Sequence, residues 1–260
     1  VGSRANYSSI KSVMSAIKAH NLLELQVVAN ASALLDKYGA VINLIEKDGF
    51  YINHRLYTLV EGENPITMAK STGLGLIDLS TAFNILKPDI VLTVGDRFET
   101  MSTVLAAAYM NIPIAHTMGG EVSGTIDESI RHAVTKFAHI HFPASQDAFN
   151  RIVKLGERPE DIFLVGCPRI DLVNKILKNL EKVNLEYINA MGVGDNIDLN
   201  KDFILVSQHP VTTEFGNDEE NIFQTLKAVN STNLQAIILW PNADAGSYDI
   251  SKGMRKFREL

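Results

Sequence analysis

The chain has 260 residues, of which 46% are hydrophobic and 21% are charged, with 24 Lys and Arg against 30 Asp and Glu. This composition predicts a globular protein with a large apolar core and excludes collagen-like, disordered and membrane-spanning chains. The net charge of −6 and the absence of a long basic run argue against binding to nucleic acid or to a membrane surface. Cys167 is the only cysteine, which excludes a disulfide framework and a thiolate metal site and fits a cytoplasmic protein.

The sequence opens with Val1-Gly2-Ser3-Arg4, which is typical of the last residue of a buried strand followed by a glycine turn. The body of that strand is missing, and the amphipathic pattern over 248–259 stops without a cap or a following strand. We therefore expect the chain to be a fragment.

Short apolar runs rich in β-branched residues alternate with helical patterns along the rest of the chain. The expected strands are 25–29, 90–94, 113–116, 139–143, 162–165, 203–207 and 236–240. The expected helices are 7–20, 31–38, 64–86, 98–110, 126–138, 145–155, 171–190, 217–230 and 248–259. Strands that alternate with helices predict an α/β fold with buried parallel sheets.

A glycine and a proline flank Cys167 directly after the fifth of these strands, and a fresh series of strands and helices begins further on. We place a domain boundary there, which divides the chain into a domain 1–166 and a domain 167–260. Only two strands fall in the second domain, too few for an independent sheet domain, so we expect it to be incomplete.

Ligands of open parallel sheets bind beyond the carboxyl ends of the strands, so the turns there are the places to inspect. In the first turn, Arg4 stands among small residues at the start of a helix, either as an anion site or as part of an ordinary turn. That turn lacks the G-x-G-x-x-G pattern of dinucleotide sites. In a second turn, Asp96 and Arg97 leave an apolar strand together, and capping the next helix is the simpler role for Asp96.

The segment 116–132 is the richest in chemistry. Gly119, Gly120 and Gly124 lie within six residues and indicate a close approach of the backbone to another group. Glu121 lies in the same loop, and the helix that follows carries Asp127 and Arg131 on one face. Helix capping and an ordinary salt bridge would also explain the spacing, but the density of acids, Arg and His favours a functional site.

Three histidines give weaker signals. His139 and His141 point to one face of a strand, but no further ligands stand at a recognisable spacing, so buried or edge histidines are the better interpretation and no metal is expected. His209 follows the first strand of the second domain, and Asn242 follows the next strand. Both lie at strand ends, where a ligand could bind.

Taken together, these segments resemble the hydrolysing UDP-N-acetylglucosamine 2-epimerases, which supply N-acetylmannosamine or related sugars for sialic-acid-type biosynthesis. The matching segments are 2–7, 87–98, 119–136, 166–168, 208–213 and 241–247. The resemblance implies two Rossmann-like domains of the glycosyltransferase B type, with a UDP-sugar between them, no cofactor, and a homodimer or homotetramer. It also implies elimination of UDP followed by addition of water, which releases a free sugar inverted at C2.

The resemblance assigns roles residue by residue. Asp96 and Asp127 match acid and base positions, and His209 and Asn242 match positions that reach the nucleotide. Arg4, Arg97 and Arg131 match cationic positions for the diphosphate or the sugar, and Gly119 and Gly120 match the loop against the substrate. Glu121 lies in that loop without an assigned role.

Two features depart from the family pattern. Met118 stands where family members commonly carry a catalytic Glu, so the proton transfer falls to Glu121 or Asp127, or this branch uses another sugar or mechanism. The family's serine-rich phosphate loop would lie beyond Leu260. Three alternatives stay open: a glycosyltransferase of the same fold, a UDP-sugar-binding protein without catalysis, and a non-hydrolysing epimerase, which the match over 119–132 disfavours.

Overall fold

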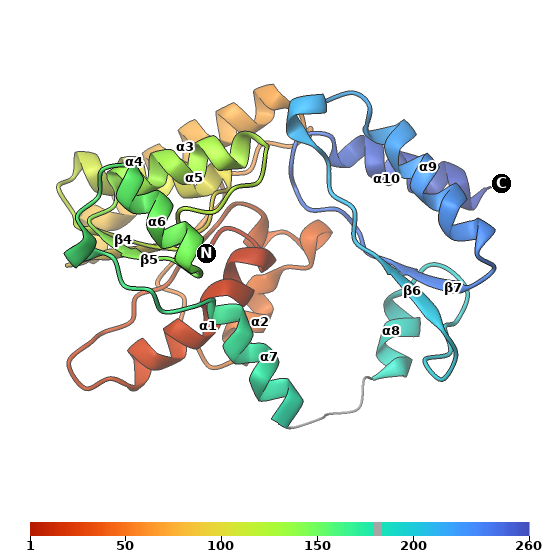
Figure 1. Ribbon diagram of the computed structural model, residues 1–260, viewed down its shortest axis with the longest axis horizontal. Helices are drawn as coiled ribbons and strands as arrows, with labels where there is room; N and C mark the ends of the chain where they lie inside the picture. The colour runs from red at the N-terminus through yellow and green to blue at the C-terminus, as the bar shows by residue number, and fades with distance from the viewer. Residues whose placement is uncertain (179–183, 260) are drawn as a thin grey trace. The chain divides into compact units, whose positions relative to one another are not determined.

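The computed structural model of the chain describes residues 1–178 and 184–259 (Figure 1). The chain divides into two compact units. Unit 1 consists of Val1–Glu61 and Ile66–Lys175, and unit 2 consists of Gly62–Pro65 and Ile176–Leu260. Within the described residues, no helix is both long enough and apolar enough to cross a bilayer.

Unit 1 begins with helix α1 (Arg4–Ala19), which starts three residues earlier than its apolar pattern predicts. The hydroxyl of Ser3 accepts the backbone N–H of Asn6 and so caps the first turn. Strand β1 (Val28–Asn30) pairs in parallel with β2 (His54–Leu56). The short helix α2 (Val41–Lys47) lies between these two strands in the chain.

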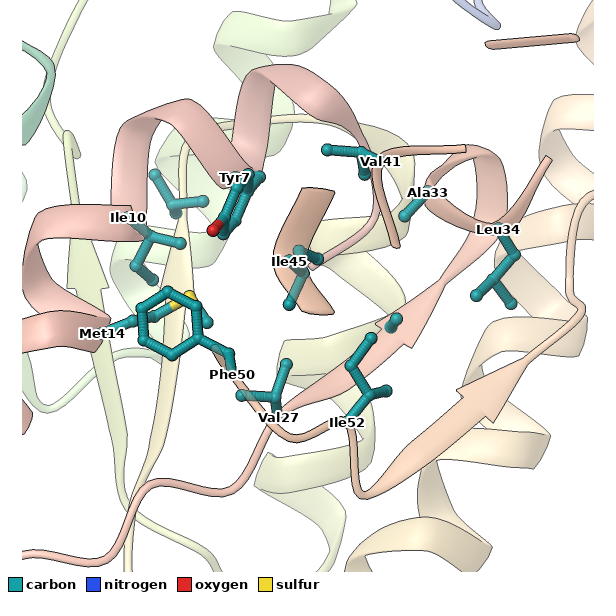
Figure 2. Packing of buried hydrophobic residues seen from close by; sticks show 12 residues of the cluster. Tyr7, Ile10, Met14, Val27, Ala33, Leu34, Val41, Ile45, Phe50 and Ile52 are labelled. Atoms are coloured by element: carbon teal, nitrogen blue, oxygen red, sulfur yellow. The ribbon is translucent and has the colours of Figure 1, made fainter. Parts of the chain in front are cut away.

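One apolar cluster of unit 1 joins these elements (Figure 2). In Figure 2, Tyr7 and Met14 of α1 point towards Phe50, with Ile45 of α2 beside them. The rings of Tyr7 and Phe50 meet edge to face, with 6.4 Å between their centroids. This packing fixes α1 against the sheet and therefore fixes the turn that precedes it.

A three-stranded parallel sheet forms the rest of unit 1, in the order β3-β4-β5. Its strands are β3 (Val91–Val94), β4 (Ile114–Thr117) and β5 (Ile140–Phe142). The helices of this part are α3 (Pro65–Leu86), α4 (Phe98–Tyr109), α5 (Ile126–Phe137) and α6 (Gln146–Lys154). A second apolar cluster includes Leu79, Val104 and Val134, which come from α3, α4 and α5. Because the strands are parallel, their carboxyl ends meet at one edge.

Unit 2 contains the parallel pair β6 (Phe203–Val206) and β7 (Gln235–Ile238). Helices α9 (Asp218–Ser231) and α10 (Ser247–Arg258) lie side by side in Figure 1, and Ile222, Leu226 and Ile250 form the buried cluster between them. Helix α7 (Pro168–Lys178) spans the division between the units, and α8 (Leu185–Met191) precedes β6.

The sequence pattern was wrong at three places. Residues 162–165 form no strand, since only Ile162 bridges to His141, while Phe163, Leu164 and Val165 are 49%, 46% and 62% exposed. The expected helix 31–38 is two short 3₁₀ turns, Ala31–Leu34 and Asp36–Tyr38. Strand β2 and helix α2 were not expected at all. Part of the expected helix 171–190, residues 179–183, lies outside the described residues.

Candidate functional site

A group of polar side chains in unit 1 lies where β3 and β4 end. Asp96 follows β3 in a turn whose Gly95 has a φ of 71°. His116, at the end of β4, lies 2.8 Å from the Gly95 carbonyl through its Nε2. A hydrogen bond from the imidazole thus ties the turn after β3 to the neighbouring strand.

An ion pair joins Asp96 to the helix that follows β4. The Nη2 of Arg131 in α5 donates to the Asp96 carboxylate. Arg131 is 5% exposed, whereas the Asp96 side chain keeps 23% of its surface exposed. The carboxylate is therefore reachable, and the guanidinium that neutralises it is buried.

Arg131 also holds the glycine loop. Its Nη1 donates to the Glu121 carbonyl at 2.8 Å and lies 3.4 Å from the hydroxyl of Ser123. Asp127 lies one turn before Arg131 and so on the same face of α5. The buried Arg131 guanidinium thus pairs with the Asp96 carboxylate and holds the backbone of Glu121, and Asp127 lies one turn away on the same helix face.

Two further contacts fix the loop. The backbone N–H groups of Ser123 and Gly124 both donate to Glu128 Oε2 at 2.8 Å, and these bonds lower the pKa of the Glu128 carboxyl. Arg151 of α6 donates to the carbonyl of Gly120. The loop is thus anchored from both following helices.

Gly119 and Gly120 have different reasons to lack a side chain. A Cβ on Gly119 would lie 2.8 Å from His116 Nδ1, which is too close for an ordinary contact. Gly120 has a φ of 78°, and its Cβ would collide with the Ala148 carbonyl oxygen. The close approach that the glycines indicate is therefore to the protein itself.

The pKa values of two groups at this edge are shifted. Burial raises the pKa of the Glu121 carboxyl, and the nearby Arg169 guanidinium offsets part of that rise. Burial also lowers the pKa of the His116 imidazole to about 4, against the opposing effect of its bond to Gly95. His116 is fully buried and hence neutral near pH 7, which suits a positioning role.

The other two arginines occupy different surroundings. Arg97 is buried, and its Nε donates to Glu99 Oε1 at 2.8 Å, so its guanidinium is held inside unit 1 in this conformation. Arg4 is exposed at the first position of α1, directly after the Ser3 cap. Arg4 is therefore accessible to a ligand without rearrangement.

Met118 lies against the apolar core of unit 1. Its side chain is half-buried and packs against the apolar cluster of α1, β1 and α2. Its backbone has a φ of 60°, and its N–H donates to the Phe142 carbonyl at 3.0 Å. The Met118 side chain therefore has a packing role.

In unit 2, His209 and Asn242 lie in the turns that follow β6 and β7. His209 Nδ1 lies 3.4 Å from the backbone N–H of Asn242, which donates to it. Three buried oxygen atoms nearby in the chain have no hydrogen-bond partner within the part that the structure describes: Thr212 Oγ1, Asn242 Oδ1 and Ser247 Oγ. Buried polar atoms of this kind are usually satisfied by a ligand or water.

The histidines of the expected strand 139–143 differ in exposure: His141 is 1% exposed, whereas His139 is an exposed residue. No group of three or more potential metal ligands occurs within residues 1–178 and 184–259. The sequence alone does not single out Glu99, Ser123 and Arg151. The spacing of Arg97 and Glu99 could have indicated their pair, whereas nothing local in the sequence marks Arg151 as a partner of the loop.

Comparison with known proteins gives a consistent family. The family model of UDP-N-acetylglucosamine 2-epimerase matches residues 15–260. A "UDP-N,N'-diacetylbacillosamine 2-epimerase (hydrolyzing)" of Legionella pneumophila is 32% identical over 257 residues, which are 98% of this chain and 66% of the relative. A "GDP/UDP-N,N'-diacetylbacillosamine 2-epimerase (hydrolyzing)" of Campylobacter jejuni is 30% identical, with 98% and 65% covered. The chain thus spans slightly less than two thirds of these relatives.

The fold agrees with the sequence match. The crystal structure of UDP-GlcNAc 2-epimerase from Neisseria meningitidis bound to UDP-GlcNAc aligns with a TM-score of 0.78, at 18% identity, over 98% of this chain and 68% of that one. The fold class is therefore α/β with Rossmann-like domains of the glycosyltransferase B type, as expected. By its family model, its relatives and its fold, the chain belongs to the UDP-N-acetylglucosamine 2-epimerase family.

Proposed function

We propose that the protein of which this sequence is part is a hydrolysing 2-epimerase of a UDP-2-acetamido sugar. UDP-N-acetylglucosamine and UDP-N,N'-diacetylbacillosamine are the two substrates to test, because the names of relatives carry them. The observation that carries the proposal is the ion pair of Asp96 with the buried Arg131, whose guanidinium also binds the backbone of Glu121 and which shares a helix face with Asp127.

The proposed reaction has two steps. In the first, a carboxylate removes the proton from C2, the C1–O bond to UDP breaks, and a C1–C2 double bond forms. In the second, water adds its oxygen to C1 while C2 receives a proton on the opposite face. Such a reaction requires one group that accepts a proton and one that donates it.

The carboxyl groups at this edge suit those two tasks. Asp96 is paired with Arg131 and partly exposed, so we assign it to contact the sugar as a charged group. Glu121, whose pKa burial raises, is the better proton donor, and Asp127 is the remaining acceptor. Arg4 is the accessible cation for the departing diphosphate, and Arg97 positions the turn through Glu99.

Two polar turns of unit 2 supply the second part of the proposal. We assign His209 and Asn242 to the nucleotide, supported by the unpartnered oxygen atoms of Thr212, Asn242 and Ser247.

The test is the reaction of the full-length protein with each UDP-sugar in deuterium oxide. We expect release of UDP and of a free sugar that carries one deuterium at C2. We expect Asp127→Asn to lower the rate at least about a hundredfold, the usual contribution of an acid or base. A UDP-sugar product would indicate a non-hydrolysing epimerase. Transfer of the sugar without deuterium exchange at C2 would indicate a glycosyltransferase. Binding of the UDP-sugar without release of UDP would indicate a protein that only binds.

A further inference from the structure

The long helix α3 carries apolar side chains on two opposite faces. Leu79 and Phe83 lie on the buried face and belong to the second apolar cluster of unit 1. On the other face, Leu74, Ile77 and Ile85 are 43%, 65% and 59% exposed. Their spacing of three, eight and eleven residues places these three side chains on one side of a helix. A contiguous exposed apolar patch of this kind marks a surface that contacts another molecule.

The exposed face of α3 carries few charges. Among the 22 residues of the helix, only Lys70 and Asp78 are charged. Helices at the surface of globular proteins normally place charged and polar residues on the face that points away from the core. Lys70 is exposed and Asp78 is half-buried, and neither is ion-paired within the described residues. Two opposite charges are therefore available to a partner at this face.

Gly73 lies on the same face, beside Leu74. A glycine in a helix interior is destabilising relative to alanine, so its position needs a reason. For Gly75 the reason lies within unit 1, because a Cβ there would lie 2.8 Å from Ser102 Oγ of α4. A Cβ on Gly73 would meet no described atom within 4 Å. The packing of unit 1 therefore does not require Gly73, whereas the close approach of a second helix does.

The two charges make α3 complementary to a second copy of itself. Lys70 and Asp78 lie four positions before and four positions after Leu74. In a two-fold contact the same surface of each copy meets the other. Two antiparallel α3 helices with the two-fold axis at Leu74 therefore place Lys70 opposite Asp78 of the partner subunit, and they do so twice. A parallel pair would instead bring like charges together, which is unfavourable.

We propose that α3 is a dimer interface, in which α3 packs antiparallel against α3 of a second copy with the two-fold axis at Leu74. Ile77 lies in the apolar centre of this contact, and Gly73 allows the two backbones to approach there. Lys70 pairs with Asp78 of the partner subunit at each edge, and this charge complementarity sets the register. The inference does not depend on the proposed reaction, since none of these residues belongs to the candidate site.

The test is sedimentation velocity of the full-length protein over a range of concentrations. Ile77→Asp places a carboxylate in the apolar centre of the contact in both copies, so we expect it to raise the dimer Kd at least about a hundredfold. Ile176→Asp is the matched control, because Ile176 is 62% exposed on α7 and lies outside the proposed contact. This control should change the dimer Kd by no more than about twofold.

Reversal of the charges tests the antiparallel register. Lys70→Asp replaces both ion pairs by pairs of carboxylates, and we expect it to raise the dimer Kd at least about tenfold. Adding Asp78→Lys to the same chain restores opposite charges in exchanged order, so the double variant should return to within about threefold of the wild-type Kd. A parallel contact gives no such rescue, because like charges then face each other in every one of these variants.

A wild-type protein that stays monomeric would overturn the proposal, and so would a dimer that Ile77→Asp leaves intact. Loss of the dimer in Lys70→Asp without recovery in the double variant would overturn the antiparallel register. If Ile77→Asp is not recovered folded, Leu74→Cys takes its place in a Cys167→Ser background, which removes the only native cysteine. A short bismaleimide should then join two copies through the new thiols, and the absence of a cross-linked dimer would overturn the proposal.

Discussion

At the scale of single residues, the glycine loop has positions whose requirements differ although their sequence context is similar. Gly120 and Gly124 share a positive φ, 78° and 70°. A Cβ on Gly120 would collide with the Ala148 carbonyl, whereas nothing lies within 4 Å of a Cβ on Gly124. The first position therefore combines backbone strain with a steric clash, and the second has backbone strain alone.

We predict that Gly120→Ala lowers the free energy of unfolding by about 3 kcal/mol or more, since the left-handed backbone alone costs about 1–3 kcal/mol. Gly124→Ala is the matched control, with an expected loss of about 1 kcal/mol from backbone strain. Urea denaturation followed by circular dichroism measures both. Equal losses for the two variants would show that the contact with α6 does not constrain the loop.

At the scale of elements, apolar patterns that repeat over many residues predict the helices correctly. The apolar faces of α1, α4, α5, α9 and α10 predicted helices within a few residues of their observed bounds. The pattern over 162–165 failed because Phe163, Leu164 and Val165 are exposed, and β-branched composition does not reveal whether a partner strand is present. Strand β2 was missed because its three residues, His54, Arg55 and Leu56, include two polar ones.

His116 ties the turn after β3 to β4, and its burial makes the stability of the fold sensitive to pH. The pKa of His116 is about 4 in the fold and about 6.5 when unfolded. Between these pH values the unfolded chain binds more protons than the folded chain. The contribution of the neutral His116 to the free energy of unfolding is therefore fully present above pH 6.5 and is lost as the pH falls towards 4. The loss amounts to about 3 kcal/mol at most, at roughly 1.4 kcal/mol for each pKa unit.

We predict that His116→Gln removes this part of the pH dependence. The Gln amide keeps a donor for the Gly95 carbonyl but does not titrate. Urea midpoints at pH 6.5, 5.5 and 4.5 should converge for the variant relative to the wild type. His20→Gln, at an exposed position after α1, should keep the wild-type slope. An unchanged slope in His116→Gln would assign the pH dependence to other groups, such as the buried His141.

At the scale of the whole molecule, a site prediction from sequence works where partners are close in the chain and fails where folding brings them together. The spacing of Asp127 and Arg131 follows from helix geometry, and both lie on α5 as expected. The pairing of Arg131 with Asp96 crosses 35 positions and depends on the order of β3 and β4. The anchoring of Gly120 by Arg151 depends in the same way on α6.

The proposed function divides chemistry and nucleotide binding between the two units, and this division is testable in the full-length protein. Asp96 belongs to unit 1, and Asn242 belongs to unit 2. We predict that Asp96→Asn lowers kcat at least about a hundredfold and leaves the Kd for UDP within about twofold. Asn242→Ala should weaken UDP about tenfold, because Asn242 Oδ1 is a buried acceptor without a partner in the described residues.

Calorimetric titration with UDP and steady-state release of UDP measure the two effects separately. Asn230→Ala, at the exposed end of α9, is the control that should change neither. Effects at independent sites add as free energies, so the double variant should show both losses multiplied. If Asp96→Asn instead raises the Kd for UDP as much as Asn242→Ala does, Asp96 contributes to nucleotide binding and the division between the two units is wrong.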